Sequence, residues 1–201
     1  GTSFLVAFFK NLGITLTQGD VAKPNSIFEC ILDIIGIAIV PAICEEFAMR
    51  CCALGLLKNY GKAFGVVSVS VVFGLLHGNV IQFIFAFLVG LVLAYITIKT
   101  ESIIPAMCIH ALNNGMSAVS DTVNYAAGKE VNVTVGFFAF WLLVGIIATI
   151  YLAIKHKLTI PKDDGNCVLT LGEKVSSFFF PGMILPFIVL IIMTAQTVKI
   201  G

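Results

Sequence analysis

Six residues that could do acid–base chemistry or donate hydrogen bonds lie within long apolar stretches of the sequence. An ionisable group at the centre of a bilayer costs from about 2.5 to over 10 kcal/mol, depending on how it is assessed. A chain that keeps such groups is expected to use them for catalysis or transport. The six residues are Glu45, Glu46, Arg50, His77, His110 and Asn114.

The spacing of these residues pairs them on helix faces. Glu46 and Arg50 are four residues apart with the acid first, which is the favourable order for an ion pair on a helix. His110 and Asn114 have the same spacing, so both should point to one side of their helix. Glu45 projects about 100° around the helix from Glu46. The two acids are therefore expected to differ, with Glu46 held by Arg50 and Glu45 free to face a cavity.

Glu45, His77 and His110 are also expected to lie at a similar depth. At the helical rise per residue, each lies about 16 to 22 Å from the lysine-flanked end of its predicted helix. Polar groups inside a membrane normally face the bundle interior and pair with one another, so the sequence predicts one polar cavity. Amide hydrolysis needs a base, a positioned water and donors to the developing oxyanion. These residue types can supply all three.

The elements that must position these residues are apolar helices. Of the 201 residues, 59% are hydrophobic and 11% are charged, and the mean hydropathy is +1.04. A soluble domain carries about 25% charged residues. The sequence therefore predicts an all-α fold, a polytopic transmembrane bundle of about six helices with the active site buried within it. The candidate helices run over residues 27–58, 62–78, 80–98, 102–120, 134–155 and 178–198.

The first candidate is longer than the roughly 20 residues that cross a membrane. Pro41 lies inside it, removes a backbone donor and is expected to kink or break it. Residues 1–22 are expected to form an N-terminal flank that holds either the end of a truncated helix or an interfacial segment. Residues 23–201 are expected to form one domain, with the chemistry-bearing core in 27–120. The net charge of +1 gives no basic face for nucleic acid.

Three motifs follow one another on successive predicted helices. They are EExxxR in residues 45–50, FxxxH in residues 73–77 and HxxxN in residues 110–114. Together, and in this order, they resemble the CPBP family, also called ABI or CAAX-protease-like proteins. That family includes the type II CAAX prenyl endopeptidases and bacterial proteins linked to bacteriocin processing and immunity. The resemblance covers about residues 27–120.

The resemblance implies intramembrane hydrolysis of a peptide bond. Glu45 is implied to activate the attacking water, and His77 to help hold that water. His110 and Asn114 are implied to donate to the carbonyl oxygen as it becomes an oxyanion. The residues implied to support the site are Glu46 and Arg50.

The sequence leaves open whether a metal takes part. Glu45, His77 and His110 could supply a carboxylate and two imidazoles to zinc, with water in the fourth position. The same residues could act without metal, and no HExxH motif is present. The pairing of His110 with Asn114 on one face favours the metal-free alternative, because it suits oxyanion binding.

Two other functions remain alternatives to the endopeptidase. One is a non-catalytic membrane immunity or scaffold protein of the same fold. The other is a proton- or ion-coupled transporter that uses the Glu/His cluster as a relay. The endopeptidase is expected to act on a peptide or protein substrate, either CAAX-type and lipidated or a leader peptide. Its other partner would be membrane lipid, in the multi-pass setting of a bacterial or archaeal cell membrane.

Overall fold

The computed structural model of the chain describes residues 14–16, 24–128, 143, 147, 150–151, 154–155, 169–177, 181–195 and 198–200. Contacts divide the chain into two compact units. Unit 1 comprises Gly1–Asp20, Ala48–Ser102 and Pro161–Gly201, and unit 2 comprises Val21–Phe47 and Ile103–Ile160.

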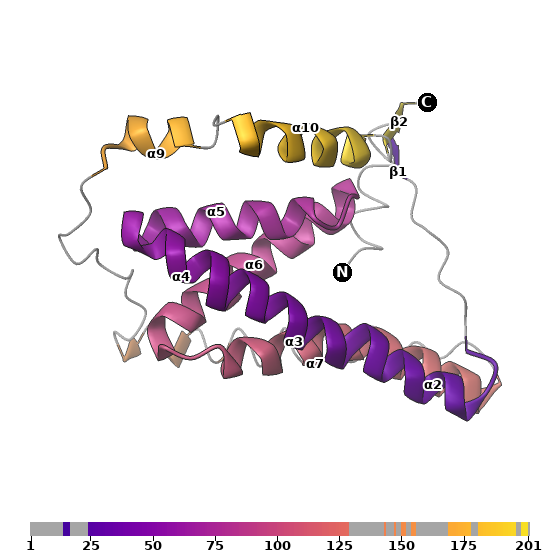
Figure 1. Cartoon of the computed structure of the whole chain (residues 1–201). Helices are drawn as coiled ribbons and strands as arrows, with labels where there is room; N and C mark the ends of the chain where they lie inside the picture. The colour runs from indigo at the N-terminus through magenta and orange to yellow at the C-terminus, as the bar shows by residue number, and fades with distance from the viewer. Residues whose placement is uncertain are drawn as a thin grey trace. The chain divides into compact units, whose positions relative to one another are not determined.

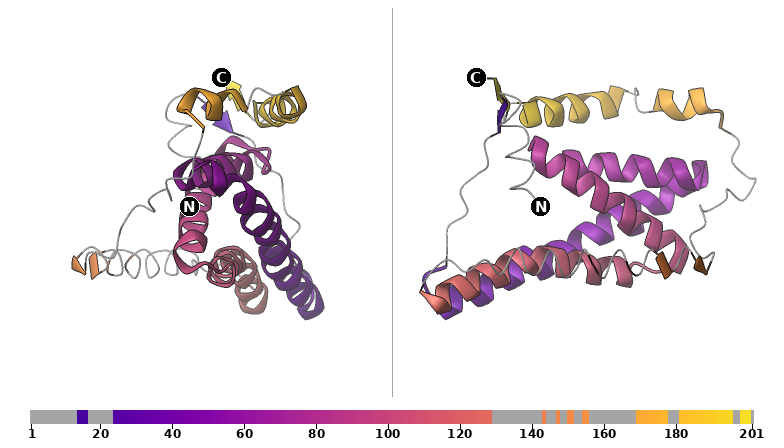
Figure 2. Two further views of the ribbon diagram at one scale, coloured as in Figure 1. Left: turned by 60° about the vertical axis from the view of Figure 1, so that its left-hand side comes forward. Right: turned by 180° about the vertical axis from the view of Figure 1, so that it is seen from behind.

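Unit 2 contains the acidic pair and the HxxxN motif. Its first helix, α2 (Ile27–Asp33), continues as the π-helical segment η1 (Ile34–Ile39) and then as α3 (Val40–Glu46). The long helix α7 (Ile104–Ala127) lies along all three segments (Figures 1 and 2). This packing brings the end of α3 beside the first half of α7.

Local signals explain where the helices of unit 2 begin and end. The Ser26 hydroxyl accepts a hydrogen bond from the Glu29 N–H at 3.1 Å, and the Glu29 carboxylate accepts one from the Asn25 N–H at 2.7 Å. Such caps satisfy backbone donors that the first turn leaves unpaired. At the other end, Gly128 closes α7 with a φ of 62°, a left-handed conformation that favours glycine.

Unit 1 contains Arg50 and the FxxxH motif. Phe47–Ala53 form the π-helical segment η2, which begins in unit 2 at Phe47 and continues into unit 1 as α4 (Leu54–Leu57) and the 3₁₀ turn η3 (Lys58–Tyr60). Two apolar helices follow, α5 (Lys62–Leu75) and α6 (Val80–Thr100), which pack against each other. The remaining elements of this unit are α9 (Leu171–Ser177), α10 (Pro181–Ala195) and the strands β1 (Ile14–Leu16) and β2 (Val198–Ile200).

The α5–α6 hairpin depends on small residues. Its turn contains Gly78, with a φ of 61°. A side chain at Gly74 would meet the Phe83 ring at 2.9 Å, and one at Gly90 would meet Ser70 at 3.3 Å. Glycine at these positions lets the two helices approach closely, as is common in membrane proteins.

Pro41 was expected to kink or break the first helix, and the prediction of a break was wrong. The helical backbone runs from Ile27 to Tyr60 without interruption. Pro41 lies in the first turn of α3, directly after η1. In an α-helix the N–H of residue 41 would bond the Ile37 carbonyl, and proline cannot make that bond. A wider π-helical turn before Pro41 thus replaces the expected break.

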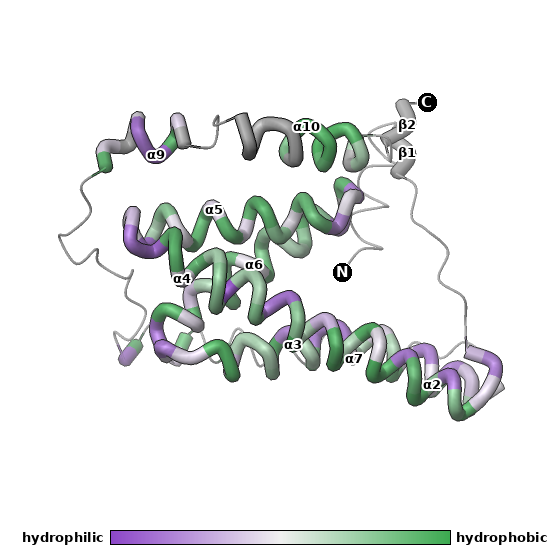
Figure 3. Tube along the Cα trace, in the orientation of Figure 1, coloured by the Kyte–Doolittle hydropathy of each residue, from purple (hydrophilic) through white to green (hydrophobic). Residues whose placement is uncertain are grey.

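The membrane-spanning prediction is supported for two helices within the described residues. Ile27–Tyr60 and Gln82–Thr100 are long and apolar enough to cross a membrane, and Figure 3 shows the apolar character of α6 and of its neighbour α5. The described residues are helical apart from loops and the antiparallel β1–β2 pair. The fifth predicted helix, residues 134–155, lies mostly outside the described residues, as does most of the flank 1–22. The sixth is observed as α10.

Candidate active site

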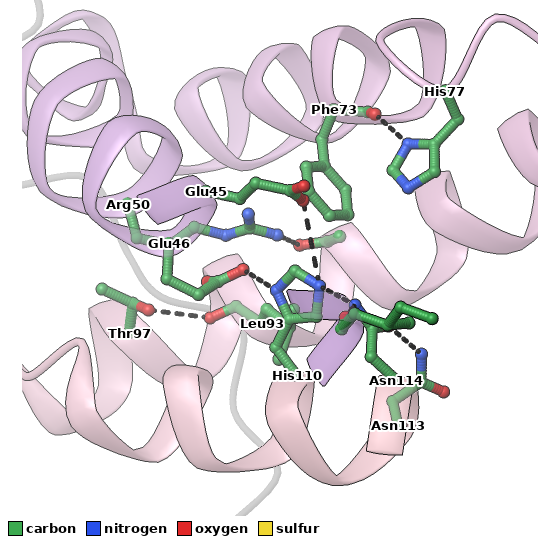
Figure 4. Close-up of polar contacts among 12 residues, drawn as sticks. Glu45, Glu46, Arg50, Phe73, His77, Leu93, Thr97, His110, Asn113 and Asn114 are labelled. Atoms are coloured by element: carbon green, nitrogen blue, oxygen red, sulfur yellow. Dashed lines mark hydrogen bonds and ion pairs between the residues drawn. The ribbon is translucent and has the colours of Figure 1, made fainter. Parts of the chain in front are cut away.

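A buried carboxylate–imidazole pair joins α3 to α7 in unit 2. His110 Nδ1 lies 2.8 Å from Glu46 Oε1, and Figure 4 shows the two side chains pointing toward one another. Glu46 is fully buried and His110 is 3% exposed. Sequence reasoning missed this contact because the partners are 64 residues apart. The ion pair expected between Glu46 and Arg50 stays a prediction.

Asn114 extends the pair on the same face of α7. Its Nδ2 atom lies 3.1 Å from His110 Nε2 and 3.2 Å from the carbonyl oxygen of Ile37 (Figure 4). The prediction that His110 and Asn114 point the same way is confirmed. Asn113 Nδ2 donates to Asn114 Oδ1 at 3.2 Å.

These contacts define the hydrogen positions on His110. The Ile37 carbonyl can only accept, so it must face the amide NH₂ of Asn114. The other hydrogen of that NH₂ group then donates to Nε2, which acts as an acceptor. The proton of the neutral ring is therefore on Nδ1, where it donates to the Glu46 carboxylate. In this arrangement Asn114 is a donor, whereas His110 is not yet one at Nε2.

Glu45 differs from its neighbour in exposure. Its side chain is 43% exposed, and its Oε2 atom lies 3.9 Å from His110 Nε2. That distance is too long for a direct hydrogen bond and short enough for one water molecule to bridge the two atoms. The expected difference between the two acids is thus seen in their surroundings. Glu46 is enclosed with His110, whereas the Glu45 carboxylate is partly exposed.

Arg50 belongs to a second cluster, within unit 1. Its guanidinium lies 4.5 Å from the centre of the Phe73 ring, and its NH2 atom donates to the Gly90 carbonyl at 3.4 Å. Arg50 and Phe73 are each 2% exposed. A cation over an aromatic face is attracted by about 0.5 to 2 kcal/mol, the larger value applying when the pair is desolvated. Arg50 therefore ties η2 to α5 and α6.

His77 lies at the end of α5 in the same cluster. Its Nδ1 atom is 2.9 Å from the Phe73 carbonyl oxygen, which can only accept, so Nδ1 carries the hydrogen (Figure 4). The two rings meet edge to face, with centroids 5.1 Å apart. In the neutral ring Nε2 is then an acceptor. His77 is exposed, and the prediction that it shares a cavity with His110 stays a prediction.

The FxxxH spacing and Pro41 were signals for two contacts that sequence reasoning did not identify. Phe73 is one turn before His77, so its carbonyl is within reach of the His77 ring. Pro41 is one turn after Ile37, so an α-helix offers that carbonyl no N–H at position 41. No feature of the sequence indicated that Arg50 would donate to the Gly90 carbonyl.

The metal-dependent alternative does not fit His110 as it is placed here. A histidine ligand needs a free lone pair, and the Nε2 lone pair accepts from Asn114 while Nδ1 holds its hydrogen. A zinc ion at Nε2 would have to displace the Asn114 amide. Among the residues that the structure describes, no group of three or more His, Cys, Asp or Glu side chains is placed to hold a metal ion.

Comparison with known proteins gives a family match for the part of the chain that holds these clusters. Residues 27–116 match the family model described as type II CAAX prenyl endopeptidase Rce1-like. The comparisons with curated proteins and with solved structures gave no match. The Rce1-like family is membrane-embedded and implies protease activity of the CAAX type. Residues 27–116, which hold all three motifs, thus match the CAAX-protease-like family that these motifs resemble.

Proposed function

We propose that this protein is an intramembrane endopeptidase that hydrolyses a peptide bond with a water molecule activated by Glu45. In this proposal residues 23–201 form one domain, a multi-pass bundle of about six helices with the site buried inside it. The setting is a bacterial or archaeal cell membrane. The site comprises Glu45, Glu46, Arg50, His77, His110 and Asn114.

The observation that carries the proposal is the contrast between the two adjacent acids. Glu46 is enclosed and occupied by His110, whereas the Glu45 carboxylate is half-exposed and 3.9 Å from His110 Nε2. A general base must reach its water and must not be neutralised by a permanent partner. The partly exposed Glu45 meets both requirements. Glu46, which is buried against His110, is suited to positioning that imidazole. The arrangement supports a division of labour between them.

The reaction then proceeds in two steps. Glu45 takes a proton from water, and the water oxygen bonds to the carbonyl carbon while the carbonyl electron pair moves onto oxygen. The resulting tetrahedral oxyanion collapses, the C–N bond breaks, and Glu45 returns its proton to the leaving nitrogen. In the proposal His77 helps to hold the water.

Asn114 is the first donor to the oxyanion. Its NH₂ group is already aimed by the Ile37 carbonyl, and the Asn114 hydrogen that points at His110 Nε2 is the one available to a substrate oxygen. Protonation of Nε2 would make His110 the second donor, with the Glu46 carboxylate stabilising the resulting imidazolium. Donors fixed before reaction cost no reorganisation, and losing one typically lowers the rate by about 10² to 10³.

The substrate class in this proposal is a peptide or protein that ends in a prenylated CAAX-type sequence. Its lipid chain would lie in the surrounding membrane while its peptide bond enters the site. The name of the matched family supports this choice. Arg50 contributes by joining η2 to α5 and α6.

A cleavage assay with matched variants tests the proposal. The full chain in liposomes would receive two fluorescent peptides of one CAAX-type sequence, one with a farnesyl group on the cysteine and one without. Glu45→Gln keeps size and removes the base, so cleavage should fall by about 10² to 10⁴. Glu101→Gln makes the same change at an exposed residue between α6 and α7 and should leave cleavage unchanged.

The outcomes separate the alternatives. Cleavage of the farnesylated peptide alone supports the prenyl-dependent class, and equal cleavage of both peptides overturns it. Undiminished cleavage by Glu45→Gln refutes the role of Glu45. A folded wild-type protein that cleaves neither peptide contradicts the CAAX-type substrate class, and failure to cleave a leader peptide as well favours the immunity or scaffold alternative.

A further inference from the structure

We infer that Pro41 is a positioning residue that orients the Asn114 side chain toward His110. It does so by lacking a backbone N–H, which leaves the Ile37 carbonyl available to the Asn114 amide. The effect on catalysis rests on the proposed function, whereas the effect on the hydrogen positions of His110 does not.

The first step is the backbone around Pro41. In an α-helix the Ile37 carbonyl would accept from the N–H of residue 41. Proline has no N–H, and its ring crowds that carbonyl. The chain widens here into η1, in which the Val40 N–H donates to the Ile35 carbonyl five residues back. The Ile37 carbonyl therefore lies within η1 and has no donor at position 41.

The second step is the orientation of the Asn114 amide. Asn114 Nδ2 lies 3.2 Å from the Ile37 oxygen and 3.1 Å from His110 Nε2. The two hydrogens of one NH₂ group thus serve two acceptors. A flipped amide would place Oδ1 against the Ile37 oxygen, which is repulsive. The carbonyl therefore selects the orientation in which Asn114 presents N–H, rather than C=O, to the imidazole.

The third step links this orientation to His110. With an N–H from Asn114 at Nε2, the neutral ring must carry its proton on Nδ1, where it faces Glu46 Oε1 at 2.8 Å. A histidine ring is commonly set in one tautomer by the hydrogen bond at its other nitrogen. Pro41 therefore reaches the imidazole through two hydrogen bonds, although it contributes no side-chain donor or acceptor.

Two replacements at position 41 isolate the missing N–H. Pro41→Ala supplies an N–H that can compete for the Ile37 carbonyl. Pro41→lactic acid, introduced as an α-hydroxy acid, has the same methyl side chain but an ester oxygen in place of N–H. The readout is the ¹⁵N NMR spectrum of the imidazoles in the full chain. The three histidines keep the spectrum simple, and loss of a signal in His110→Gln assigns it.

We expect wild type and Pro41→lactic acid to show one neutral form of His110 with the proton on Nδ1. Pro41→Ala should show both neutral tautomers, and its kcat should fall by about 10- to 100-fold with little change in KM, because a misplaced donor weakens the transition state. A merely structural proline predicts otherwise. Alanine inside a helix would then raise Tm and leave the His110 spectrum unaltered.

A second variant keeps the inference testable if Pro41→Ala does not fold. Ala38→lactic acid keeps the methyl group and converts the Ile37 carbonyl into an ester carbonyl, a weaker acceptor. It should change the His110 spectrum in the same direction. A wild-type His110 spectrum in every folded variant would overturn the inference. If no form cleaves peptide, the proposed function fails, while the spectra still decide the role of Pro41.

Discussion

His110 and Glu46 form a buried hydrogen bond of 2.8 Å between α7 and α3. Each residue satisfies the other, since the imidazole Nδ1–H needs an acceptor and the enclosed carboxylate needs a donor. Breaking such a pair on one side leaves a buried polar group without its partner, which costs more than the pair itself contributes. The pair therefore gives a prediction for stability that does not depend on the proposed reaction.

Glu46→Leu should destabilise the protein by about 1 to 3 kcal/mol, because it leaves the Nδ1–H of His110 without this acceptor. Glu46→Gln is the matched control, since its amide oxygen can still accept from Nδ1–H, and it should cost less. Unfolding in mixed detergent, followed by circular dichroism, measures both free energies. Equal stability of Glu46→Leu and wild type would show that the contact contributes nothing.

The Arg50–Phe73 contact gives a second prediction. Replacing Phe73 by Leu removes the aromatic face beneath the guanidinium and keeps the backbone carbonyl that holds His77. Replacing Arg50 by Met removes the cation. A double-mutant cycle should give a coupling free energy of about 0.5 to 2 kcal/mol. Strictly additive losses in unfolding experiments would mean that Phe73 only fills space.

The sequence could predict contacts that follow from local helix geometry. The four-residue spacing of His110 and Asn114 places them on one face, and they are 3.1 Å apart. The same rule suggested Arg50 as the partner of Glu46 but could not suggest His110. Nothing in a helical repeat reports which residue of α7 meets the end of α3, because that depends on how the helices pack.

Pro41 shows the other limit of sequence reasoning. The rule that proline interrupts a helix assumes an α-helical register, and one widened turn removes the conflict. The helix then continues, and the carbonyl that would have lost its partner gains one from α7. Composition nevertheless predicted the apolar helices well, because long apolar runs such as α6 have few other stable structures.

Outside the apolar helices, Thr170 and Glu173 cap the start of α9. The Glu173 carboxylate accepts hydrogen bonds from the Thr170 N–H at 2.7 Å and hydroxyl at 2.8 Å. The hydrogen bond from the Thr170 backbone N–H, which has the larger effect, and the one from the Thr170 hydroxyl both lower the pKa of Glu173. The stabilisation is present above the carboxyl's unfolded pKa and is lost as the pH falls through the lower folded pKa.

Thr170→Ala should raise the pKa of Glu173, because it removes the hydroxyl donor and leaves the backbone N–H. Thr170→Ser keeps the hydroxyl and should preserve the wild-type value. A pH titration of the Glu173 side-chain ¹³C shift in the full chain checks both. The same pKa in Thr170→Ala and Thr170→Ser would mean that the backbone bond alone sets it.

The placement of His110 predicts that cleavage does not need a bound metal. Nδ1 is engaged with Glu46 and Nε2 with Asn114, so a zinc ion would have to displace an existing hydrogen bond. Activity should therefore persist after dialysis against dipicolinic acid, with less than stoichiometric zinc by elemental analysis. Loss of cleavage on chelation, with recovery in proportion to added zinc, would contradict this. Asn114→Ala sharpens the test, because it frees His110 Nε2. If zinc binds at Nε2, this variant should bind zinc more tightly than wild type. If zinc does not bind there, the variant should cleave more slowly with no change in zinc affinity.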